Sequence, residues 1–304
     1  MKIKQFLLST AVICPLAFVA RLVQYFTVID KNGYFLHGGL LNTFLSFMVY
    51  AVIAVAAILA VVTAFSKPKI QANYDCCVGG KGMGALFIGC AFIVMLTSGI
   101  FFTSANYRFV FPVTPDTIPD LLTVVSAVLG VLCAVHFAFV GVSAYSGSKW
   151  AIARKLGIVS PIYFAIYGIR EFYSTFDVAG KSETRILMLS ICLCALFIMT
   201  LVLSHVGSEI YYNRIAGTAG ILAVSCALTG PAQLIAMIIG KQDFSILYLL
   251  QALLHTALIF IAFFVLTRLS FITPEADEEI EPIEFSPLDK FINEIPDEDR
   301  GNDE

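Results

Sequence analysis

Long apolar runs separated by short polar segments fill most of this chain. A helix needs about 20 predominantly apolar residues to cross roughly 30 Å of hydrocarbon. Runs of that length lie at about residues 5–27, 40–65, 84–105, 120–145, 157–177, 186–206, 215–239 and 245–269. The pattern therefore predicts an all-α protein, a polytopic bundle of eight transmembrane helices.

The fifth run, residues 157–177, is the least apolar because it carries Arg170 and Glu171 side by side. Two charges at the bilayer centre would cost about 5 to 6 kcal/mol, against roughly 4 kcal/mol gained from the large apolar residues of the run. The charges lie near one end of the run, where the cost falls, and packing against other helices lowers it further. We therefore expect this run to span, with a seven-span protein as the alternative.

Composition narrows the class of protein. Hydrophobic residues make up 59% of the chain, charged residues make up 13%, and the mean hydropathy is +0.86. A soluble domain usually carries about a quarter charged residues, so this chain cannot cover itself with a polar surface. These values exclude a soluble enzyme and a nucleic-acid-binding protein, and they make the lipid bilayer the expected surroundings.

Charge divides the chain into two domains. Residues 271–304 carry thirteen acidic and two basic residues, whereas the remainder carries nine acidic and seventeen basic residues. We expect a transmembrane helical domain over residues 1–270 and an acidic, mostly disordered tail over residues 271–304.

The tail contains one patterned segment. Ser286 and Pro287 predict the start of a short amphipathic helix near residues 287–295. Its apolar side would carry Phe285, Leu288, Phe291, Ile292 and Ile295. So short a helix is unstable alone, so we expect these residues to bind a cytoplasmic protein partner or the basic inner loops.

Orientation follows from the Lys and Arg residues near the ends of the runs. With the N-terminus inside, twelve basic residues fall on the cytoplasmic side and five fall outside. This predicts a cell-membrane protein with both termini in the cytoplasm. The seven-span alternative gives twelve basic residues inside and six outside, and it places the tail outside. The counts of basic residues therefore do not decide between seven and eight spans. The first run should remain as a span, because Phe18 is a poor residue three positions before a signal-peptide cleavage site.

The first and fifth runs share an order of residue types: a proline, an arginine, an aromatic pair and an aspartate. These are Pro15, Arg21, Tyr25, Phe26 and Asp30 in the first run, and Pro161, Arg170, Phe172, Tyr173 and Asp177 in the fifth. The order suggests a 4+4 parallel repeat, with chance similarity among membrane sequences as the alternative.

Polar residues of the fifth run recur at helical spacing. Ser160, Tyr163, Tyr167, Arg170, Ser174 and Asp177 step by three or four residues and so share one stripe. This stripe should face away from lipid. Glu171 is rotated by about 100° from Arg170, so we expect its partner to come from another helix.

Arg21 and Gln24 of the first run share a face, and two buried arginines near one depth would repel each other without an anion. We therefore expect a polar cavity between the first and fifth runs. Gly230 and Pro231 predict a kink in the seventh run, which would add Gln233 to the cavity wall. The candidate residues for binding a small solute or anion are Arg21, Gln24, Tyr163, Tyr167, Arg170, Glu171 and Gln233. The alternative is that the arginines reach the headgroups or form structural ion pairs.

Other residue types give weaker indications. Gln251 and His255 share a helix face, and His136 lies in the fourth run; each could join a proton relay or bond a neighbouring helix.

No pair of cysteines has metal-ligand spacing, so we expect neither a metal nor another cofactor. The glycine-rich segment at residues 79–84 is interpreted as a flexible linker, and the absence of a catalytic motif does not favour an enzyme.

The chain resembles uncharacterised multi-pass bacterial membrane proteins. The residues that carry this resemblance are Arg21, Gln24, Asp30, Gly33, Tyr34 and Phe35, together with residues 287–292. The resemblance implies a membrane location and no particular activity. The function that we expect is that of a small-solute secondary transporter; the alternatives are a non-transporting adaptor or sensor subunit acting through the acidic tail and, third, an intramembrane enzyme.

Overall fold

The computed structural model describes residues 2–31, 39–67, 70–72, 74–110, 117–147, 155–175, 182–206 and 210–272. The chain divides into two compact units, Met1–Thr273 and Pro274–Glu304. The tail helix expected near residues 287–295, with Phe285, Leu288, Phe291, Ile292 and Ile295, lies outside the described residues, as do Asp177 and the loop residues 33–35.

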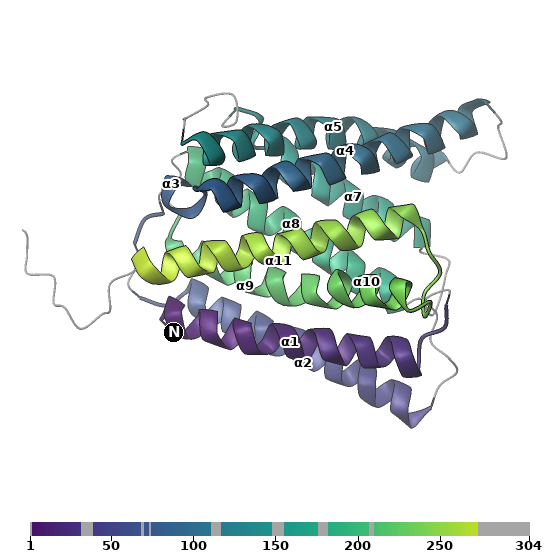
Figure 1. Cartoon of the computed structure of the whole chain (residues 1–304), viewed down its shortest axis with the longest axis horizontal. Coiled ribbons are helices and arrows are strands. Elements are labelled where there is room, and N and C mark those ends of the chain that lie inside the picture. Colours follow the sequence, from purple (N-terminus) through teal and green to yellow (C-terminus); the bar gives the residue numbers. More distant parts are fainter. Residues whose placement is uncertain are drawn as a thin grey trace, which may run out of the picture. The chain divides into compact units, whose positions relative to one another are not determined.

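Helices account for nearly all of the described chain, which confirms the all-α prediction (Figure 1). They are α1 (Ile3–Thr27), α2 (Leu40–Ala64), α3 (Tyr74–Cys77), α4 (Lys81–Val110), α5 (Thr117–Ser146), α7 (Val159–Thr175), α8 (Ser182–Val206), α9 (Tyr212–Thr229), α10 (Pro231–Ile238) and α11 (Ile246–Ile272). Within the described residues, seven helical segments are long and apolar enough to cross a membrane, α9 and α10 counting as one. The 17-residue α7 corresponds to the fifth predicted run, residues 157–177, and is not among these seven, so the count is one below the eight spans that we predicted.

The kink predicted in the seventh run is confirmed, since α9 ends at Thr229 and α10 begins at Pro231. Proline has no backbone N–H to continue the helical ladder. A Cβ atom on Gly230 would lie 2.9 Å from the backbone nitrogen of Thr256 and 3.1 Å from the carbonyl oxygen of Ala252. The break therefore lies directly against the backbone of α11, where a larger side chain does not fit.

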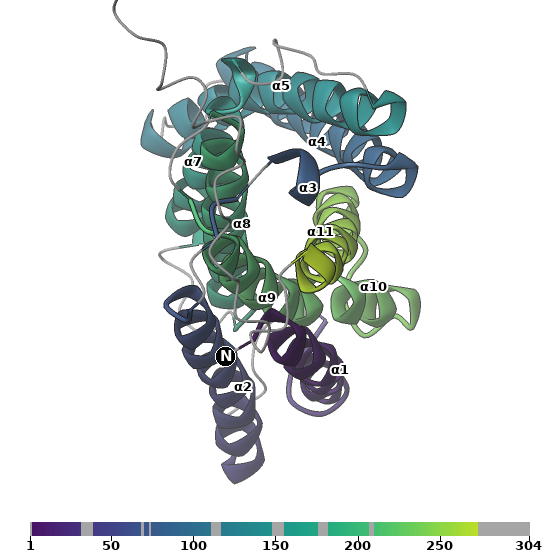
Figure 2. The same ribbon diagram turned by 90° about the vertical axis from the view of Figure 1, so that its left-hand side faces the viewer.

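Six helices form a closed ring, which we call the helix ring. Successive members pack against each other in the order α4, α5, α7, α8, α9 and α11, and α11 packs back against α4. Figure 2 views this ring along the helices. The interior is filled by fully buried side chains, among them Phe137, Phe164, Phe197, Leu222 and Ile261.

The remaining long helices, α1 and α2, pack on the outside of α9, and α1 also contacts α10 and α11. In a parallel repeat they would be equivalent to α7 and α8, which instead belong to the helix ring. The predicted 4+4 repeat is therefore not reproduced in how the helices pack.

Residues 70–72 and 74–80 lie at one end of the helix ring (Figure 2). Gln71 and Tyr211 form an antiparallel β-bridge, and α3 contacts both α8 and α11 (Figure 2). The Tyr74 ring stacks on His205 with centroids 3.8 Å apart. The interpretation of residues 79–84 as a flexible linker is wrong for residues 81–84, because they form the first turn of α4.

The outward side of the helices is apolar. On α1, Leu8, Val12, Leu16 and Val19 step along one face and are each more than half exposed. On α2, most large apolar side chains are exposed as well. An apolar surface this continuous belongs in hydrocarbon, so the chain is an integral membrane protein in contact with the lipid bilayer.

Two glycines allow α4 and α5 to approach closely. A Cβ atom on Gly84 would lie 2.6 Å from the carbonyl oxygen of Gly141, and one on Gly141 would lie 2.8 Å from that of Gly84. Small residues at such crossings let two helix backbones meet. Gly89 of the same helix has open space around it.

We predict that Gly84→Ala lowers the free energy of unfolding by about 1 to 3 kcal/mol, because the added methyl group overlaps α5 backbone. The matched control, Gly89→Ala, should be neutral or stabilise by up to roughly 1 kcal/mol, because alanine favours helix and meets no neighbour. Thermal unfolding in detergent measures both variants. Equal effects would show that the crossing does not depend on close backbone approach.

Candidate functional site

The polar stripe of α7 faces the interior of the helix ring, as its spacing predicts. Ser160, Tyr163 and Tyr167 are almost fully buried, whereas Ile162 and Ile169 on the other side are exposed. The two tyrosine rings stack with centroids 5.8 Å apart. The side chain of Ser174 is not among those described, so the observed stripe runs from Ser160 to Arg170.

A charge pair ends this stripe. Nη1 of Arg170 donates to Oε1 of Glu171, and Nε of Arg170 donates to Oγ1 of Thr123 on α5 at 3.1 Å. The guanidinium also lies 4.2 Å from the centre of the Phe101 ring on α4. One partner of Glu171 is thus its own neighbour on α7, because both side chains are long enough to reach around the helix. Together the two groups carry no net charge, which reduces the cost of burying them.

A hydrogen bond crosses the helix ring from α11 to α7. Nε2 of Gln251 donates to the hydroxyl oxygen of Tyr167. One turn further along α11, Nδ1 of His255 bonds Oγ1 of Thr229 at 2.9 Å. His136 bonds Ser160 at 2.6 Å between Nδ1 and Oγ. His136 and His255 therefore both bond neighbouring helices, which was one of the two roles considered for them.

Some polar atoms in the interior have no hydrogen-bond partner among the described residues. They are the hydroxyl of Tyr163, Oγ of Ser126 and Oε1 of Gln251. Tyr163 lies against α5 at Gly130, one turn from Ser126, and it stacks on Tyr167, the partner of Gln251. Each unpaired buried polar atom costs about 1 to 3 kcal/mol. The region around the two tyrosines thus has more hydrogen-bonding capacity than the packing uses.

The other candidate residues lie elsewhere. Arg21 is 1% exposed; its Nη1 donates to Oε1 of Gln24 at 2.7 Å, and its guanidinium lies 4.8 Å from the centre of the Tyr25 ring. Gln233 is buried on α10, which packs against α1.

The predicted pairing of the first and fifth runs is wrong. The packing neighbours of α7 are α5 and α8, whereas α1 packs outside the helix ring on α2, α9, α10 and α11. Similar residue types in two runs do not make those runs neighbours. The candidate residues therefore form two groups, with Arg21, Gln24 and Gln233 on α1 and α10, and Tyr163, Tyr167, Arg170 and Glu171 on α7.

The sequence did not predict some of the residues that lie at these sites. Thr123, Ser126 and Phe101 surround the α7 group, but a lone threonine, serine or phenylalanine in an apolar run gives no sequence signal. Cys194, Cys226 and His255 were missed as a set because they lie on three different helices, yet their ligand atoms are all within 4.8 Å of one another. These three could hold a metal ion.

Two Tyr→Phe substitutions compare the loss of a hydrogen-bonded hydroxyl with the loss of a hydroxyl that has no partner. We predict that Tyr167→Phe lowers the free energy of unfolding by about 1 to 3 kcal/mol, because the amide nitrogen of Gln251 loses its partner. Tyr163→Phe should be neutral or stabilise by about 1 kcal/mol, because it removes a hydroxyl that has no partner. Chemical unfolding of both variants in one detergent tests this; a loss at Tyr163 as large as that at Tyr167 contradicts it.

Neither protein-family models, nor curated proteins, nor solved structures give a match to this chain. Seven apolar helical segments of spanning length, with apolar side chains on their outward faces, identify the chain as an integral, multi-pass membrane protein.

Proposed function

We propose that this protein transports a small polar solute through the helix ring and that the observed conformation is the closed state. The observation that carries the proposal is the set of buried polar atoms without partners: the hydroxyl of Tyr163, Oγ of Ser126 and Oε1 of Gln251. Helices that only pack in a membrane gain nothing from such atoms, since apolar or small residues would pack equally well. A solute with its own donors and acceptors would satisfy them.

The charges around this site favour a solute without net charge. Arg170 is paired with Glu171, so neither group is left to balance an ion. The remaining groups near Tyr163 are hydroxyls and an amide, which recognise neutral hydrogen-bonding molecules or zwitterions. The sequence left open whether the ligand is a small solute or an anion. The charges of this site favour a neutral or zwitterionic solute.

A solute that crosses the membrane through the helix ring would have to pass both ends of the ring. Side-chain and helix contacts close each end, and these contacts could open. At one end, the Arg170–Glu171 pair lies against Phe101 and Thr123. At the other, α3 lies between α8 and α11. The distribution of basic residues favours a cytoplasmic N-terminus, and Figure 1 places α3 at the same end of the helices as the N-terminus. We therefore propose that α3 closes the cytoplasmic end.

Uptake into liposomes tests the proposal directly. The full chain should accumulate at least one labelled member of a panel of neutral amino acids, sugars and polyols. Tyr163→Phe should reduce that uptake at least tenfold, because the hydroxyl would bind the solute. Tyr173→Phe is the matched control, since Tyr173 lies on the exposed side of the same helix, and it should leave uptake unchanged. No uptake of any panel member, or equal loss in both variants, contradicts the proposal.

Cys77 provides a second test, at the α3 end. Its thiol is fully buried, and burial raises its pKa to about 12 although the Arg268 guanidinium acts in the opposite direction. The thiol is therefore protonated and unreactive at neutral pH. If α3 moves aside during transport, a membrane-impermeant maleimide applied from the cytoplasmic side should modify Cys77 several-fold faster when a transported solute is present.

The neighbouring Cys76, which is partly exposed, serves as the control for this experiment. It should react from the cytoplasmic side at a rate that does not depend on solute. Modification of Cys76 from the outside only would overturn the proposed orientation, whereas an unchanged rate at Cys77 would show that α3 does not move.

A further inference from the structure

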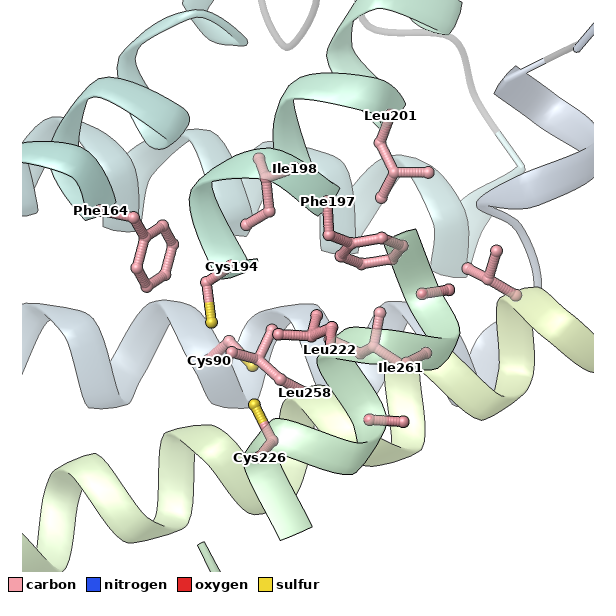
Figure 3. Close-up of a cluster of buried hydrophobic side chains, with 14 of the residues drawn as sticks. Cys90, Phe164, Cys194, Phe197, Ile198, Leu201, Leu222, Cys226, Leu258 and Ile261 are labelled. Carbon is pink, nitrogen blue, oxygen red and sulfur yellow. The ribbon is translucent and has the colours of Figure 1, made fainter. Parts of the chain in front are cut away.

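We propose that Cys194, Cys226 and His255 form a binding site for a thiophilic metal cation inside the helix ring, with Zn²⁺ as the ion that fits best. The three residues come from α8, α9 and α11; both cysteines are fully buried, and His255 is 2% exposed. Their ligand atoms lie within 4.8 Å of one another. Figure 3 shows the sulfur atoms of Cys194 and Cys226, with that of Cys90 from α4 beside them.

The spacing is close to that of a formed site. Zn–S bonds of about 2.3 Å in a tetrahedron place two sulfur atoms roughly 3.8 Å apart. Ligand atoms within 4.8 Å of one another therefore need to move by no more than about 1 Å to close on an ion. A change of this size is within the reach of side-chain rotation, without any rearrangement of the helices.

One ring nitrogen of His255 has the kind of hydrogen-bond partner that metal-binding histidines usually have. Its Nδ1 bonds Oγ1 of Thr229 at 2.9 Å, and Thr229 lies 3.4 Å from Oγ of Ser190 in turn. A ligating histidine typically donates its second ring nitrogen to such a partner, which fixes the tautomer. With the proton on Nδ1, the lone pair of Nε2 remains for the ion.

Charge balance selects the ion. In an apolar interior, a bound ion and its ligands must come close to net neutrality. Two thiols that release one proton each to solvent supply two negative charges, which balance a divalent cation, and the imidazole stays neutral. Thiolate and imidazole ligands exclude Mg²⁺ and Ca²⁺, which require oxygen ligands. Cu⁺ would be balanced by a single thiolate and is the competing ion of the same soft class.

The position of the site gives the ion a role in the fold. The amide of Gly230 donates to the carbonyl oxygen of Cys226 at 2.7 Å, so Cys226 lies in the last turn before the break between α9 and α10. An ion held by α8, α9 and α11 would join these helices beside the break. It would therefore stabilise the closed helix ring whether or not the protein transports a solute.

Metal analysis of the untagged full chain in detergent tests the proposal. After removal of metal and addition of Co²⁺, a probe with visible absorption, wild-type protein should bind one equivalent and show a sulfur-to-cobalt charge-transfer band. Displacement of Co²⁺ by Zn²⁺, followed in parallel with Cu⁺, shows which ion is held more tightly. The Cys194→Ser and His255→Gln variants should each lose at least tenfold in Co²⁺ affinity.

The matched control is Cys192→Ser, which removes an exposed thiol two residues away on the same helix and should leave binding unchanged. Since a buried variant could fail to fold, the wild-type melting temperature is measured with and without Co²⁺, and it should rise with metal concentration. Less than a tenth of an equivalent bound to wild-type protein, or equal affinity in the Cys194→Ser and Cys192→Ser variants, overturns the proposal.

Discussion

The absence of water from a bilayer interior determines where the polar side chains of the membrane-spanning helices can lie. A hydroxyl, amide or charged group must find its partners within the protein, because hydrocarbon offers none. The helices of the ring accordingly direct Tyr163, Tyr167, Thr229, Gln251 and His255 inward. Among the seven apolar segments found in the described part of the chain, α2 has the smallest share of buried residues, and it lies on the outside of α9.

The same constraint explains how α7 can lie among these helices. Its sequence is the least suited to insertion, because one segment carries both a guanidinium and a carboxylate. In the structure the two groups neutralise each other, and α5 and α4 supply a hydroxyl and an aromatic ring to the guanidinium. The stability of α7 among these helices therefore depends on its neighbours more than on its own hydropathy.

Sequence patterns predicted the positions of the helices well but not their neighbours. Apolar runs located the helices, and the Gly230–Pro231 pair located the break in the seventh run. The spacing of Ser160, Tyr163 and Tyr167 also predicted which side of α7 is buried. Periodicity describes a helix around its own axis, however, and does not identify the helix opposite. This is why Arg21 was grouped with Arg170, and why one residue from each of three helices, as in the cysteine and histidine set, gives no recognisable spacing.

The backbone pairing at the end of the helix ring has a consequence for motion. The amide of Ala72 donates to the carbonyl oxygen of Ile210 at 2.6 Å, and the amide of Tyr212 donates to that of Ile70 at 3.0 Å. Two reciprocal bonds of this kind break together rather than by gradual stretching, because each holds the geometry of the other. Opening of this end should consequently expose both amides at once, so that amide hydrogen exchange at positions 72 and 212 shows one shared protection factor.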